Sequence, residues 1–504
     1  MAEGRHSSSP YEPTVDTLRP VRSGLVVVRN MTSWNRLEDV LPAIQSDGRI
    51  AIDFVIDRGS KFAAGLPGHL MSLGIAPLSW RQAQSRRFDL VLAAHANRRL
   101  FDLPGPLVLL PHGAGYSRIV PWSTGDETSP VGLASGQITG ADGALPRAIC
   151  LSHAAQLDQL IAACPDAAER GVVIGDPTLD RMTASRHRRP HYRRLLGVEA
   201  QHTLVVLTST WGLHSAVATA ETFVHRLAAQ LPSDEFRLAL VLHPNIWTRH
   251  SMWTIRRAFR DPLDAGMVII PPDRGWQAAV LAADIVIGDH GSVASYAAAQ
   301  GIPLLLAATG LAELDPHSHR CLLSKAADRI DPHGEFAPQL RAAITRHDTA
   351  ALTALTELTF GRPGECLALL QRLLYQVIEL DPPRSKGGRP RMLAVPDPRP
   401  ERGEGVTAYL VSARTPTAGS VELARYPAIM SEHRRPDDDA DLFTVVEDAE
   451  VDIRMRQSAD VFVHDADQLP ERTASTWIKQ ILDEYPGTLM AAARTRSGCL
   501  IGLR

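Results

Sequence analysis

The chain of 504 residues is poor in cysteine, which argues against domains held together by disulfides or by structural zinc. The five cysteines are odd in number, widely separated and never spaced as CxxC: Cys150, Cys164, Cys321, Cys366 and Cys499. Such a pattern indicates neither a disulfide framework nor a structural zinc site. It fits a reducing compartment, so we predict a cytoplasmic protein.

The chain also lacks a large net charge and a long hydrophobic run. The formal net charge is −3, so no global field attracts nucleic acid or an anionic membrane, and any anionic ligand must be bound locally. The uncharged run 291–312 is divided by Gln300, Gly301 and Pro303, which argues against a membrane span. We therefore predict no nucleic-acid partner and no membrane span, and leave peripheral membrane association open.

Short apolar segments that alternate with helix-like segments make up most of the chain. This alternation predicts an α/β fold with two Rossmann-like parallel-sheet domains in tandem and a small C-terminal α+β module. The predicted boundaries are a flexible tail without a signal peptide at 1–23, an N-terminal domain at 24–170, a second domain with closing helices at 171–380, an exposed linker at 381–405 and an accessory module at 406–504.

The most informative stretch is 278–306, which reads as helix, strand, tight loop, helix and strand. Its loop, Asp289 to Ser292, follows an apolar strand at the end where open α/β sheets bind ligands. A hydroxyl at Ser292, no side chain at Gly291 and the N–H groups of the helix start at Val293 suit a phosphate group. The alternative is that Ser292 is only an N-cap and Gly291 only a turn residue.

Three other strand ends carry polar residues that point to group transfer. His112 and Gly113 follow a strand of the first domain, Thr210 follows the first strand of the second domain, and His243 follows the next. A histidine titrates near neutral pH and can act as a general base, so His112 is the candidate for removing a proton from an attacking hydroxyl. His243 is a candidate donor to a phosphate oxygen.

Five motifs in this order resemble the CDP-glycerol glycerophosphotransferase family of wall teichoic acid synthesis, a cell-envelope polymer pathway. They are HG at 112–113, GxPxxD at 175–180, a TxTW-like strand end at 208–211, HP at 243–244 and DIVIGDHGSV at 284–293. The resemblance implies the GT-B fold, with the acceptor on the N-terminal domain and a nucleotide donor on the second.

The same resemblance assigns roles to single residues. His112 is similar to the family's catalytic base, His243 and Ser292 to its contacts with the donor phosphates, and Asp289 to the residue that shapes the loop. We also predict that Gly113, Thr210, Gly291 and Val293 bind the substrate or the donor.

We therefore predict a metal-independent transferase that moves a glycosyl or polyol-phosphate group from a nucleotide-activated donor to an acceptor hydroxyl, with no separate cofactor. The aspartate run at 437–439 and the DxD pattern at 465–467 are too weak a signal for a metal site. Two alternatives stay open: an enzyme like the non-hydrolysing UDP-sugar 2-epimerases, and a nucleotide-binding scaffold without chemistry. The nucleotide, the transferred group, the acceptor and the oligomeric state are not predicted.

Overall fold

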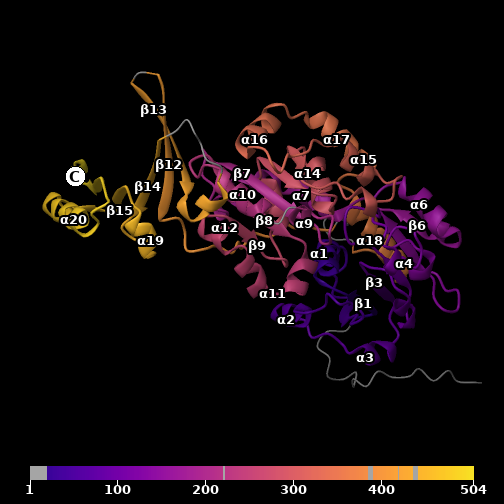
Figure 1. The fold of residues 1–504 in the computed structure, drawn as a ribbon. Helices are drawn as coiled ribbons and strands as arrows, with labels where there is room; N and C mark the ends of the chain where they lie inside the picture. Colours follow the sequence, from indigo (N-terminus) through magenta and orange to yellow (C-terminus); the bar gives the residue numbers. More distant parts are fainter. Residues whose placement is uncertain (1–19, 220–221, 384–389, 418, 435–440) are drawn as a thin grey trace, which may run out of the picture. The chain divides into compact units, whose positions relative to one another are not determined.

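The computed structural model describes residues 20–219, 222–383, 390–417, 419–434 and 441–504. The chain forms two compact units, drawn in Figure 1. The first contains Met1–Ala184 and Glu357–Ala394, and the second contains Ser185–Thr356 and Val395–Arg504. Of the predicted flexible tail at 1–23, residues 1–19 lie outside the described residues.

The first unit is built on a six-stranded parallel sheet in the order β2-β1-β3-β4-β5-β6. Its strands are β1 (Arg22–Val28), β2 (Ile50–Ile56), β3 (Leu90–Ala93), β4 (Leu107–Leu109), β5 (Ala148–Leu151) and β6 (Gly171–Val173). Its helices are α1 (Met31–Val40), α2 (Leu66–Ser72), α3 (Trp80–Gln84), α4 (Pro121–Thr124), α5 (Ser135–Ile138), α6 (Gln156–Ala163), α7 (Pro177–Ala184) and α18 (Cys366–Val377).

Both faces of this sheet are covered, which explains why its strands are continuously apolar. On β1, Leu25 and Val27 enter one hydrophobic core, while Val26 and Val28 enter the other. Successive side chains of a strand point to opposite faces, so a strand buried on both sides cannot alternate with polar residues.

The second unit contains a five-stranded parallel sheet in the order β11-β10-β7-β8-β9. Its strands are β7 (Thr203–Ser209), β8 (Phe236–Leu242), β9 (Val268–Ile270), β10 (Ile285–Gly288) and β11 (Leu304–Leu306). The helices around it are α8 (Arg189–Leu195), α9 (Ala216–Thr219), α10 (Phe223–Gln230), α11 (Pro244–Ala258), α12 (Arg260–Asp264), α13 (Trp276–Ala282), α14 (Ser292–Ala299), α15 (His319–Ala326), α16 (Phe336–Thr345) and α17 (Thr349–Glu357).

The C-terminal module forms a mixed six-stranded sheet in the order β13-β12-β14-β15-β16-β17. Its elements are β12 (Ala408–Thr417), β13 (Ser420–Pro427), η7 (Ala428–His433), β14 (Asp441–Glu447), α19 (Ile453–Gln457), β15 (Val461–Leu469), α20 (Glu471–Glu484), β16 (Met490–Thr495) and β17 (Gly498–Leu503). Figure 1 draws this sheet in orange to yellow. The predicted fold class, two parallel-sheet domains and a small α+β module, is confirmed.

Each parallel sheet has one point where the strand order reverses. In the first sheet the chain steps from β1 outward to β2 and then returns to place β3 on the other side of β1. In the second it steps from β7 through β8 to β9 and then places β10 on the other side of β7. Connections leave such a pair in opposite directions, so the carboxyl ends of β1 and β3, and of β7 and β10, are the expected ligand positions.

The predicted boundary between residues 170 and 171 is wrong, because β6 and α7 belong to the first unit. The chain also returns to this unit with α18, which was predicted to close the second domain. Asp180 of α7 explains the return: its carboxylate accepts hydrogen bonds from the backbone N–H groups of Gly364 and Cys366, at 2.6 and 3.0 Å. The GxPxxD motif is therefore structural, and burial raises the pKa of Asp180.

The predicted linker 381–405 is not wholly exposed. Val395 is 1% exposed, and its backbone N–H donates to the Ser185 hydroxyl at 2.9 Å. Further along, Glu401 forms a backbone bridge with Ile269 at the edge of the second sheet. Residues 395–405 thus belong to the second unit and run along it, since their backbone finds hydrogen-bond partners there.

The C-terminal module contacts α10 and α12 through β13 and η7. The backbone N–H of Ser233 donates to the carbonyl of Arg425 at 2.7 Å, and Arg425 forms an ion pair with Asp234. We conclude that the module is docked against the second unit and is not a free appendage. Among the described residues, no helix combines the length and the apolar character needed to cross a bilayer.

Candidate functional site

Asp289 connects the two strand ends at the reversal point of the second sheet. One carboxylate oxygen accepts from the backbone N–H of Thr210, after β7, at 2.8 Å and from that of Ala216 at 2.9 Å. The other accepts from the N–H of Gly291 at 2.9 Å. Asp289 is 2% exposed. Burial raises the pKa of Asp289, and His290 and the three N–H donors oppose that rise.

Gly291 and Ser292 follow Asp289 at the start of α14. Gly291 is the N-cap and Ser292 is the first helical residue, so the alternative that Ser292 caps the helix is wrong. A Cβ on Gly291 would lie 3.0 Å from the Asp289 carboxylate and 3.2 Å from Thr210 Cβ, which explains the glycine. Val293 lies in the first turn and is half-buried.

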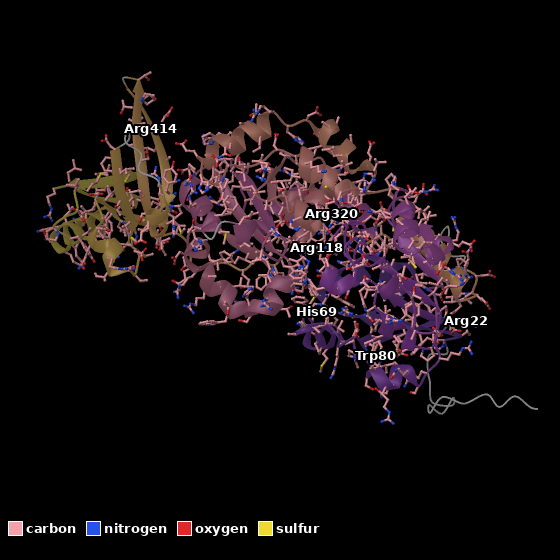
Figure 2. The ribbon with its side chains drawn as sticks, turned by 45° about the vertical axis from the view of Figure 1, so that its right-hand side comes forward. Arg22, His69, Trp80, Arg118, Arg320 and Arg414 are labelled. Atoms are coloured by element: carbon pink, nitrogen blue, oxygen red, sulfur yellow. The ribbon has the colours of Figure 1, made fainter. Side chains whose placement is uncertain are left out.

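Arg320 of α15 extends to the same helix start. Its Nη2 donates to the Ser292 hydroxyl oxygen at 3.0 Å, and the residue is 8% exposed. Figure 2 labels it. A guanidinium is unusual at the positive end of a helix, because that end favours negatively charged groups. The positive potentials of α14 and Arg320 therefore add, and together they favour an anionic group at Ser292.

His290 lies in the same loop, and its side chain is buried, at 2% exposure. Its Nε2 lies 3.2 Å from a carboxylate oxygen of Glu313. Gly310 lies against the ring, because an added Cβ would overlap the imidazole, and its φ of +53° is a left-handed conformation that suits glycine. The contact fixes the segment after β11 to the loop after β10.

His243 is the N-cap of α11 and lies at the end of β8, next to β7. Its Nδ1 accepts a hydrogen bond from the backbone N–H of Asn245 at 3.1 Å. A neutral imidazole has one donor and one acceptor nitrogen, so the proton of neutral His243 is on Nε2. The ring can therefore act as a donor through Nε2. Its centroid lies 6.5 Å from the centroid of the Trp211 ring.

His112 and Gly113 belong to the first unit, in the loop after β4. The His112 side chain is exposed. Arg36 of α1 holds this loop, because its Nη2 donates to the Gly113 carbonyl at 2.7 Å and to the Asp176 carboxylate at 3.0 Å. The two charged side chains are almost wholly buried, so the loop is fixed by an ion pair shielded from water.

The structure thus brings together Thr210, Asp289, Gly291, Ser292 and Val293, and places His243 on the adjoining strand end. Sequence reasoning missed Arg320 and Arg36. Arg320 lies on α15, beyond β11 and the short helix η5 (Leu311–Glu313), and no local pattern connects it with the start of α14. Arg36 lies inside a helix, and no local pattern distinguishes it.

The described part of the chain contains no group of three or more His, Cys, Asp or Glu side chains that could hold a metal ion. Asp465 lies within β15 and forms an ion pair with Arg494 at 3.3 Å. The aspartates 437–439 lie outside the described residues.

No family model and no curated protein matches the sequence. Similar solved structures include the wall teichoic acid polymerase TagF with CDPG, at 10% identity over 71% of this chain and 88% of TagF, with a TM-score of 0.49. MnaA of S. aureus with UDP has 12% identity over 71% and 97%, with a TM-score of 0.45. UDP-GlcNAc 2-epimerase from Neisseria meningitidis bound to UDP-GlcNAc has 11% identity over 71% and 99%, with a TM-score of 0.44. These low identities provide no residue-by-residue correspondence.

Proposed function

We propose that the protein is a transferase that moves a glycosyl or polyol-phosphate group from a nucleotide-activated donor to an acceptor hydroxyl. The observation that carries the proposal is the positive start of α14 at the reversal point of the second sheet, with Arg320 bound to Ser292 at 3.0 Å. Nucleotide phosphates are the anions that such helix starts bind in α/β folds.

In the proposed reaction the donor phosphates lie at Ser292, and His243 donates to a phosphate oxygen through Nε2. The bond between the transferred group and the nucleotide breaks, and negative charge grows on the departing phosphate. Arg320 and α14 stabilise that charge because their dipoles and donors are already oriented toward it. His112 takes the proton from the acceptor hydroxyl as the new bond forms.

Release of nucleoside mono- or diphosphate from a panel of nucleotide-activated donors tests the proposal. We expect the intact protein to release nucleotide in the presence of an acceptor and His112→Ala to lose at least about a hundredfold of that rate. His187→Ala, which changes an exposed histidine away from any strand end, is the matched control and should keep the rate.

Two results would refute parts of the proposal. A protein that binds nucleotide but releases none from any donor would be a scaffold. Full turnover in His112→Ala would leave the transfer standing but remove His112 as the base. Turnover in EDTA should equal that in buffer alone, since Arg320 and α14 supply the charge stabilisation.

A further inference from the structure

The reversal point of the first sheet holds a second polar cluster, centred on the carboxylate of Asp57. Asp57 follows β2 and is completely buried. One carboxylate oxygen accepts from Arg29, which follows β1, at 2.9 Å and from the Asn97 amide, beyond β3, at 2.7 Å. The other accepts from Arg99 at 3.3 Å and from the N–H of Gly59 at 3.1 Å. One carboxylate therefore ties together the loops after three neighbouring strands.

The two arginines remain accessible while Asp57 holds them. Their side chains are 28% exposed for Arg29 and 47% for Arg99. Arg99 also lies over the ring of Trp80, with 4.6 Å between its Cζ and the ring centroid; Figure 2 labels Trp80. A guanidinium has five N–H donors. Arg29 and Arg99 each use one of theirs for a hydrogen bond to Asp57. Donors of both arginines are thus left for solvent or a ligand.

The surrounding loops carry a local excess of positive charge. Residues 57–61, DRGSK, and 95–99, HANRR, together with Arg29, contain five Lys or Arg side chains and one carboxylate, a local net charge of +4. The whole chain has a net charge of −3, so this excess is not an average property of the protein. The α1 helix also begins directly after Arg29, at Met31, and adds its positive end.

We propose that this cluster, Arg29, Asp57, Asn97 and Arg99, binds a phosphate-ester group of the acceptor substrate. The inference rests on the proposed function, which assigns the donor phosphates to the second sheet and leaves an oxyanion site on the first for the acceptor. Arg29 and Arg99 donate to the oxyanion, and Asp57 positions them. A phosphate ester has enough terminal oxygens for two separate guanidinium groups, whereas a carboxylate has two oxygens, which a single guanidinium satisfies.

Calorimetric titration of the full chain with glycerol 3-phosphate tests the site. We expect Arg29→Gln and Arg99→Gln each to weaken binding at least about tenfold, because each removes charge-assisted hydrogen bonds. Arg29→Lys keeps the positive charge but loses the planar guanidinium. Its affinity for glycerol 3-phosphate should lie between those of the intact protein and Arg29→Gln. Thermal melting of each variant checks that the loss is not unfolding.

Arg86→Gln is the matched control. Arg86 is 34% exposed, similar to Arg29, and pairs with Asp53 at 3.7 Å outside the cluster. Its removal should leave the affinity within about twofold, since only the long-range charge changes. No detectable binding by the intact protein, or an equal loss in Arg86→Gln, would overturn the site.

Titrations with CDP and UDP separate this inference from the proposed function. If the acceptor assignment is correct, Arg29→Gln keeps nucleotide affinity and nucleotide does not displace glycerol 3-phosphate. Competitive displacement, with an equal loss of nucleotide affinity in Arg29→Gln, would assign the cluster to the donor and refute the acceptor site. If glycerol 3-phosphate binds and no nucleotide does, the proposed function fails while the oxyanion site stands and the acceptor assignment is withdrawn.

Discussion

The carboxylate of Asp289 accepts a hydrogen bond from the backbone N–H of Thr210 at 2.8 Å, between residues 79 positions apart in the chain. This bond joins the ends of β10 and β7, where the strand order of the second sheet reverses. It fixes the loop that leads into α14, so the geometry of the helix start depends on one buried side chain.

Asp289→Asn should destabilise the protein by about 1–3 kcal/mol. An amide has one acceptor oxygen, and its NH₂ group would face backbone N–H donors that the carboxylate now satisfies. Asp331→Asn is the control, because Asp331 accepts from the N–H of His333 at 2.8 Å in an exposed turn and should change stability by less than about 0.5 kcal/mol. Denaturant unfolding measures both, and equal losses would contradict the role of Asp289.

Substitutions at Ser292 should separate nucleotide binding from stability. Ser292→Ala removes the bond to Arg320 and should cost about 0.5–1.5 kcal/mol. Ser292→Asp places a carboxylate at the helix start and next to the guanidinium, so stability should be kept or raised while nucleotide affinity falls strongly. Nucleotide titration and thermal melting of each variant give the two quantities.

Ser295→Ala is the matched control on the same helix. The Ser295 hydroxyl is buried and has no hydrogen-bond partner among the described residues, so its removal should leave stability and nucleotide affinity nearly unchanged. Nucleotide affinity that survives Ser292→Asp would exclude the start of α14 from the site.

His95 should make stability depend on pH below neutrality. Burial lowers the pKa of His95, and the neighbouring Asp57, 3.4 Å away, only partly opposes this. The unfolded chain has an ordinary histidine pKa of about 6.5, so below that pH the unfolded state binds the proton more readily. The stability that the lowered pKa of His95 provides is therefore complete above about pH 6.5. It is lost as the pH falls toward the pKa of His95 in the folded protein.

The free energy of unfolding, measured from pH 7.5 to pH 5, should fall less steeply in His95→Asn than in the intact protein. His187→Asn, at an exposed position, should leave the slope unchanged. Titration of the neighbouring Asp57 does not change the slope in this pH range. Burial opposes ionisation of Asp57, yet His95, the Gly59 N–H and Arg29 hold its pKa below the ordinary range, so its contribution is lost only at more acidic pH. An identical slope in His95→Asn would contradict the prediction.

Gly310→Ala should be more damaging than an ordinary substitution at a left-handed glycine. A side chain at positive φ costs about 1–2 kcal/mol, and here the new Cβ would also overlap the His290 ring. Gly364, with φ of +77° and no atom within 4 Å of an added Cβ, provides the control for the backbone cost alone. Unfolding experiments should show a clearly larger loss for Gly310→Ala, and equal losses would mean that the loop moves away freely.

Much of the fold was predictable because it depends on local patterns. The alternation of apolar and helix-like segments predicted two parallel-sheet domains, and the turn residues after β10 located a helix start. The small C-terminal α+β module was likewise predicted from the alternation of apolar and helix-like segments. The local sequence could not distinguish Gly291 from Ser292 as the cap, because that depends on backbone angles.

The sequence by itself determined which segments are strands and which loops follow them. Only the tertiary structure decided that β10 lies beside β7 and β3 beside β1, that α18 returns to the first unit, and that Arg320 reaches Ser292 from 28 residues away. Periodicity reports whether a segment is buried, but strand order and long-range ion pairs depend on partners distant in the chain, which local patterns do not encode.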